Sequence, residues 1–263
     1  MDDRQLDLFA PPRPATVTAA RHRPAVDPAA LSDAALIAAL PEANLQDCTA
    51  LAAEAGRRRL AAAVPALARL CGRFAGWGLG AAVPEQVAAL DALSRIGTRG
   101  AAASVAEGIA RAVFVGPTLG HAVAAAAALE AKLPEDIVLT LLRHDDPRLR
   151  ANASCCARAS PAVLGLLIDL LGDLHPAVHS AAACALGRLG RVEARPLLTR
   201  LLHEAPTPEI VWALAGLADE ACFILLGRLA QRNPALTGAV IDALEASDHP
   251  RAAAIAATLQ APA

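Results

Sequence analysis

The chain has 263 residues, of which 55% are apolar and 2% aromatic, and its net charge is −2. This length suits one long array or two small domains and is sufficient for a large core. Because the net charge is close to zero, the overall charge does not indicate a nucleic-acid or membrane partner. Alanine dominates the apolar residues. Because alanine favours helices and disfavours strands, the composition predicts closely packed helices.

The first nine residues contain the most specific pattern in the chain. It runs Gln5-Leu6-Asp7-Leu8-Phe9. The pattern resembles the pentapeptide with which bacterial DNA replication and repair proteins bind the sliding clamp, and all five positions match Gln-Leu-Ser/Asp-Leu-Phe. The resemblance implies that the amide of Gln5 enters a small polar pocket. It also implies that the apolar side chains enter a groove, where full burial is worth roughly 1.5–3 kcal/mol each. The alternative is that these side chains pack onto the chain's own first helices.

Residues 10–28 are crowded with prolines and arginines. Proline removes backbone donors and disfavours helix in the residue before it. We therefore expect an extended, flexible linker that tethers the peptide at 1–9 to an ordered region at 29–263. Ser32 is a suitable N-cap for a first helix over 34–40.

From residue 84 onward, prolines followed by apolar helical patterns recur. They are Pro84, Pro117, Pro147, Pro176, Pro208 and Pro234. A self-similar step of roughly 30 residues is typical of a solenoid. Proline is tolerated in the first turn of a helix, where its missing N–H has no partner. Asp146, Thr207 and Asn233 precede three of these prolines and are predicted to be N-caps.

Each proline-led helix is followed by a second apolar pattern. Examples lie at 135–143, 161–171, 196–202 and 221–229, and Leu197, Leu198, Leu201 and Leu202 form one stripe. The unit is therefore helix, tight turn, helix. A less regular unit at 44–74 comes first, and the last ends at 249–260. The sequence predicts an all-α, right-handed solenoid of about seven antiparallel helix pairs.

The clearest repeat covers 175–190, with the sequence HPAVHSAAACALGRLG, and continues as EARPLLTRLL at 193–202. It resembles the short HEAT-like repeats named after phycobilisome lyases, and the resemblance extends over roughly 84–260. The family pattern has arginine after Pro-x-Val; His179 takes that place here, while Arg150 keeps it in the preceding unit. The resemblance implies the fold, but such repeats serve as scaffolds, adaptors and sometimes enzymes.

Arginines recur late in the predicted second helices. They are Arg69, Arg111, Arg143, Arg200 and Arg228, and Asp169 interrupts the series. In HEAT-type arrays the second helices are expected to line the concave surface, so this column could face an anionic partner such as DNA. The alternative is a solvated polar face of amphipathic helices. Arg57, Arg58 and Arg59 form a separate cluster, expected at a helix end where cations offset the helix dipole.

Other candidates for chemistry fit structural roles. The cysteines lack C-x-x-C spacing and sit among apolar residues, which predicts small core residues. His175 and His179 have no third ligand nearby, so we expect no metal. Trp212 is predicted to be helix core, and the glycine-rich segment 74–80 a longer, flexible connection. Trp77 is expected to pack beneath that segment, or to mark a contact site if it is exposed.

The leading hypothesis, from the pentapeptide and the repeats, is a non-enzymatic scaffold of bacterial DNA replication or repair. We expect it to be cytoplasmic, because the polar start of the chain lacks a signal peptide pattern. The peptide at 5–9 would bind the sliding clamp, and the solenoid would hold a second protein or DNA, with no cofactor and no membrane. The alternatives are an adaptor unrelated to DNA, such as a lyase-like or assembly protein, and a DNA-binding protein of the glycosylase type.

Overall fold

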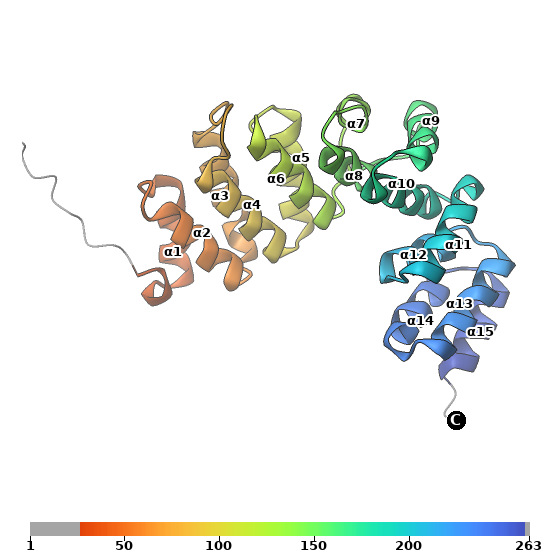
Figure 1. Cartoon of the computed structure of the whole chain (residues 1–263). Helices are drawn as coiled ribbons and strands as arrows, with labels where there is room; N and C mark the ends of the chain where they lie inside the picture. The colour runs from red at the N-terminus through yellow and green to blue at the C-terminus, as the bar shows by residue number, and fades with distance from the viewer. Residues whose placement is uncertain (1–26, 261–263) are drawn as a thin grey trace, which may run out of the picture.

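The computed structural model describes residues 27–260 (Figure 1). Within that range the chain folds into 15 α-helices joined by turns and short 3-10 segments, and it contains no strand. Helix α1 (Asp33–Ala39) opens the fold. Its N-cap is Ser32, as predicted, because the Ser32 Oγ accepts a hydrogen bond from the Ala35 N–H at 3.3 Å.

The remaining helices form seven consecutive pairs, which confirms the all-α solenoid. The first helices of the pairs are α2 (Cys48–Arg57), α4 (Pro84–Ile96), α6 (Pro117–Ala128), α8 (Pro147–Cys155), α10 (Pro176–Arg188), α12 (Pro208–Gly216) and α14 (Thr237–Glu245). The second helices are α3 (Val64–Arg73), α5 (Arg99–Ala110), α7 (Glu135–Leu142), α9 (Pro161–Asp169), α11 (Arg195–Glu204), α13 (Glu220–Arg232) and α15 (Pro250–Gln260).

Five first helices, α4, α6, α8, α10 and α12, begin on a predicted proline. Two of the predicted caps are confirmed. The Asp146 carboxylate accepts from the Arg148 N–H at 2.8 Å, and the Thr207 hydroxyl accepts from the Ile210 N–H at 3.4 Å. A side chain at each of these positions therefore satisfies an N–H that the helix leaves unpaired.

The sixth proline behaves differently. Pro234 opens only a 3-10 turn (Pro234–Leu236), and α14 begins three residues later at Thr237. The prediction that Asn233 caps this helix is wrong, because its side chain makes no capping hydrogen bond. Its N–H instead donates to the Leu229 carbonyl at 2.8 Å, which completes the last turn of α13.

The first helices stack in one continuous row, which we call the inner row. Each of them, from α2 to α14, has extensive contacts with the next. Glycine permits this close approach. A Cβ on Gly187 of α10 would lie 2.5 Å from the Ala213 carbonyl oxygen of α12, and one on Gly56 of α2 would lie 2.8 Å from the Ala92 Cα of α4. Backbone therefore packs directly on backbone along this row.

The second helices form the outer row, which is less continuous. Its extensive contacts are those of α3 with α5, α7 with α9 and α13 with α15. In Figure 1 the stack bends, and α8, α10, α12 and α14 follow the inside of the curve while α7, α9, α11 and α13 follow the outside. Each repeat contacts mainly its neighbours. Because neighbouring helices pack more closely in the inner row than in the outer row, the stack curves toward the inner row. The core between the rows consists mostly of leucine and alanine.

Candidate interaction surfaces

The five predicted arginines all belong to the outer row and are all exposed. Arg69, Arg200 and Arg228 lie within α3, α11 and α13, while Arg111 and Arg143 are the C-caps of α5 and α7. The expectation that second helices line the concave side is wrong for this chain, because here the first helices follow the inside of the curve (Figure 1). The arginines therefore do not line the concave groove.

Carboxylates lie beside two of these arginines. Arg111 contacts Glu107 at 3.3 Å, and Arg200 contacts Glu204 at 3.9 Å, with all four side chains exposed. Arg143 donates to the carbonyl of Leu139 in its own helix at 3.4 Å. Such pairs contribute little stability, but they offset the positive charge locally. The outer face is thus of mixed charge and is not a basic stripe.

Two members of the series share a cavity. Arg69 from α3 and Arg111 from α5 line a recess of about 430 Å³ between these helices, together with Glu107. The apolar lining includes Leu93 and Phe114, which are almost fully buried. Arg228 lies in a smaller groove of about 180 Å³ between α13 and α15. Arg143 and Arg200 line none of these recesses.

The inner row also has a recess, which the sequence did not predict. Trp212 on α12 is 40% exposed, so the prediction that it is helix core is wrong. It lines a recess of about 450 Å³ together with Arg188, which ends α10. The rest of the lining is made of small residues, including Gly216, Ala243 and Ser247. Tryptophan and arginine are both among the residue types enriched at the positions that dominate binding energy in protein interfaces.

A buried amide contacts the start of the glycine-rich segment that follows α3. Gln86 is fully buried, and its side-chain nitrogen lies 3.0 Å from the Cys71 carbonyl, 3.2 Å from that of Phe74 and 3.3 Å from that of Val113. Of these carbonyls only that of Phe74 belongs to the segment 74–80, whose Gly76 N–H also donates to the Val113 carbonyl at 3.3 Å. The flexibility of the segment stays a prediction. Trp77 contacts Phe74 edge to face at 5.8 Å but remains 62% exposed, so it does not pack beneath the segment.

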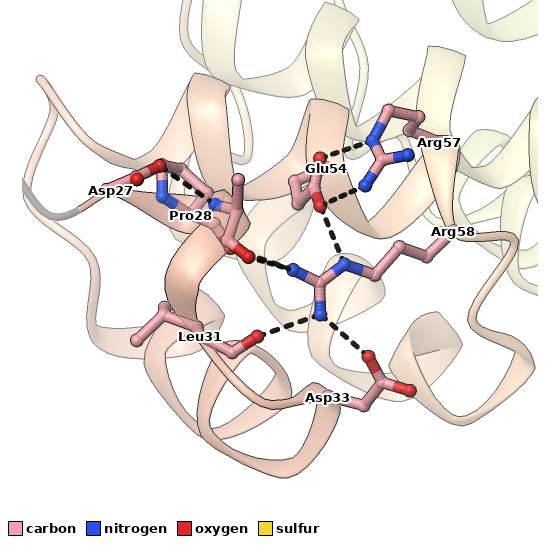
Figure 2. Close-up of polar contacts among 8 residues, drawn as sticks. Asp27, Pro28, Leu31, Asp33, Glu54, Arg57 and Arg58 are labelled. Carbon is pink, nitrogen blue, oxygen red and sulfur yellow. Dashed lines mark hydrogen bonds and ion pairs between the residues drawn. The ribbon is translucent and has the colours of Figure 1, made fainter.

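Arg58 anchors the start of the solenoid (Figure 2). This residue is the C-cap of α2, where a cation was expected, but its guanidinium does more than offset the helix dipole. It donates to the carbonyls of Pro28, Ala29 and Leu31 at 2.8–3.1 Å and to the carboxylates of Asp33 and Glu54 at 2.8 and 2.6 Å. Its planar, five-donor geometry suits this role, which a lysine could not fill.

The cysteines confirm the expectation of small core residues. Five are buried, and Cys155 is partly exposed. Burial raises the pKa of Cys71 and Cys156 to about 12 and that of Cys184 to about 11. Since the thiolate is the reactive form, these three are poor nucleophiles at neutral pH.

Within residues 27–260, no group of three His, Cys, Asp or Glu side chains is placed to hold a metal ion. His175 precedes α10, and the Nδ1 of His179 lies 3.3 Å from the Asp173 carbonyl oxygen. The same part of the chain contains no helix with the length and apolarity needed to cross a membrane.

Residues 135–218 match the family model of HEAT repeats. This stretch runs from α7 to just beyond α12, and thus covers the centre of the array, including Arg188 and Trp212. No curated protein sequence matches the chain. HEAT repeats generally act as protein-interaction scaffolds, whose stacked units create extended binding surfaces. The pentapeptide at 5–9 lies outside the described residues.

Proposed function

We propose that this protein is a non-enzymatic scaffold of bacterial DNA replication or repair. In this proposal Gln5–Phe9 bind the sliding clamp, and the inner row of the solenoid holds a second protein. The observation that carries the proposal is the combination of a complete clamp-type pentapeptide with an array of HEAT repeats. A short peptide joined to a rigid module raises the local concentration of whatever the module holds.

The inner recess supports a protein, rather than DNA, as the second partner. Trp212 offers a large apolar face and Arg188 a planar cation, and the small residues around them leave room for one or two side chains. Such a site suits a segment with an apolar side chain next to a carboxylate. The mixed charge of the outer row, seen in the Arg111–Glu107 and Arg200–Glu204 pairs, does not favour duplex binding.

The proposal is tested by measuring binding of the full chain to a bacterial sliding clamp by calorimetry. We expect a Kd of around 1 μM, or about −8 kcal/mol, because ordering the peptide offsets much of the energy of apolar burial. The double variant Leu8→Ala/Phe9→Ala should weaken binding by at least tenfold, because it removes the side chains expected to fill the groove.

The matched control is Thr16→Ala/Thr18→Ala, which changes the linker and leaves the pentapeptide intact. It should bind the clamp as the natural chain does. Absence of any binding by the natural chain would overturn the clamp assignment and favour an adaptor unrelated to DNA.

A further inference from the structure

The cavity between α3 and α5 presents an apolar lining beneath a charged rim. Cys71, Val105 and Phe114 are buried within it, and Arg69 and Arg111 stand exposed at its edge. Its volume of about 430 Å³ is enough for a few apolar side chains. It is also the recess that brings two members of the arginine series together.

The charge at the rim is positive. Glu107 pairs with Arg111 at 3.3 Å, and Arg69 makes no ion pair with any residue in the described range. One guanidinium is therefore available beside an apolar floor. The complementary occupant is a segment in which apolar side chains alternate with carboxylates.

We infer that the occupant is the chain's own segment Leu6–Phe9, which docks here when it is not bound to the clamp. Leu6, Leu8 and Phe9 supply three apolar side chains, and Asp7 lies between them. Asp2 and Asp3 add negative charge just before the segment. The regulatory consequence, competition between the cavity and the clamp for the same peptide, rests on the proposed function. The docking itself does not depend on the proposed function.

The segment is long enough to reach the cavity. Arg58 holds the Pro28 and Ala29 carbonyls at 3.0 and 3.1 Å, so the chain that follows the tail is attached at the end of α2, just before α3 (Figure 2). The backbone between Arg58 and Arg69 can span at most about 40 Å, whereas residues 10–27 can span about 60 Å. The hydrogen bonds of Arg58 thus hold Pro28 and Ala29, where the N-terminal segment joins the solenoid, close to the cavity.

Because the segment and the cavity belong to one chain, even a weak contact is populated. A short linker gives an effective concentration in the millimolar range, so a millimolar dissociation constant suffices for about half occupancy. The docked peptide is unavailable to the clamp, and the apparent Kd for the clamp rises by the inverse of the free fraction. The solenoid would thereby weaken the binding of its own N-terminal peptide to the clamp.

The docking is tested without the clamp by placing the photo-crosslinker p-benzoylphenylalanine at position 9 of the full chain. After irradiation, peptide mapping should find crosslinks within one chain to α3 or α5. Crosslinks to other elements, only between copies, or to no protein segment would overturn the assignment of this cavity.

The consequence is tested with Arg69→Glu/Arg111→Glu, which reverses the rim charge at two exposed positions. Clamp affinity should rise about twofold as the half-occupied tail is released, and the position-9 crosslinks should be lost. The matched control Arg143→Glu/Arg200→Glu makes the same charge change in the same row away from this cavity, and should change neither. Unchanged affinity in the first variant overturns the moderating role. Crosslinking without any clamp binding would leave the docking in place and remove only the proposed clamp function.

Discussion

The inner and outer rows are built from the same alanine- and leucine-rich composition but have different surfaces. Backbone approaches backbone along the inner row at Gly56, Gly187 and Gly216, and that row is continuous. In the outer row, recesses open between α3 and α5 and between α13 and α15, with arginines at their rims. The comparison indicates that small residues let the inner row pack closely, whereas recesses with an arginine among their lining residues occur in both rows.

The largest expected effect comes from filling a glycine in each row. Gly187→Ala would place a Cβ 2.5 Å from the Ala213 carbonyl oxygen and 2.8 Å from the Leu198 Cδ1, so we expect a loss of about 1–3 kcal/mol of stability. Gly165→Ala in α9 meets no atom within 4 Å, and should stabilise that helix by about 0.5–1 kcal/mol. Urea denaturation of both variants measures the difference.

Gly227→Ala sharpens this test. Its Cβ would lie 2.9 Å from the Ile255 Cγ2, a methyl group on a β-branched side chain that has little freedom at χ1, so this variant should also lose stability. The loss should be smaller than that of Gly187→Ala, which meets backbone atoms of Ala213. If Gly187→Ala and Gly165→Ala shifted the denaturation midpoint equally, the distinction between a tight inner row and an open outer row would be wrong.

The next effect concerns the N-terminal end of the inner row, where α2 contacts α1 and the 3-10 turns before and after it (Pro28–Ala30 and Leu40–Glu42). Hydrogen bonds from Arg57 and then from Arg58 hold the pKa of Glu54 down at about 2. A carboxylate with a depressed pKa stabilises the fold fully above its ordinary pKa, and that contribution disappears as the pH falls toward the folded value. The melting temperature of Glu54→Gln should therefore lie below that of the natural chain at pH 7, and the gap should narrow between about pH 4.5 and 2.

Glu204→Gln provides the control in the outer row. Glu204 is exposed and lies 3.9 Å from Arg200, so its loss should change the melting temperature little at neutral pH. A gap for Glu54→Gln that stayed constant down to pH 2 would show that the carboxylate contributes only through packing and not through its charge.

Much of the array could be predicted because its signals are local. The prolines that begin the first helices α4, α6, α8, α10 and α12 act within one turn of helix, and so do the caps Asp146 and Thr207. Trp212 could not be placed in this way, because buried Val211 and Ala213 flank it just as they would flank a core residue. Its exposure depends on the small residues that α14 presents, such as Ala243 and Ala246.

Two further features depend on contacts distant in sequence. The partners of Arg58 lie 25–30 residues earlier in the chain, apart from Glu54, and no local pattern links them. Which row lies inside the curve left no such local signal, because glycines lie near the ends of both first helices, such as Gly187 of α10, and second helices, such as Gly108 of α5. All five arginines of the predicted series belong to the outer row. Of these five, the structure brings only Arg69 and Arg111 together in one cavity.

The smallest expected effect is chemical and compares two adjacent thiols at the end of an inner-row helix. Cys155 is partly exposed, whereas Cys156 is buried, and burial raises the pKa of Cys156 to about 12. Iodoacetamide at pH 7.5 should therefore modify Cys155 first, and Cys156 only after local opening of α8. Mass spectrometry of timed digests measures both rates on the same peptide, so that each thiol is the control for the other. Equal rates would mean that the end of α8 opens readily, and the inner row would then be less firmly packed than its contacts indicate.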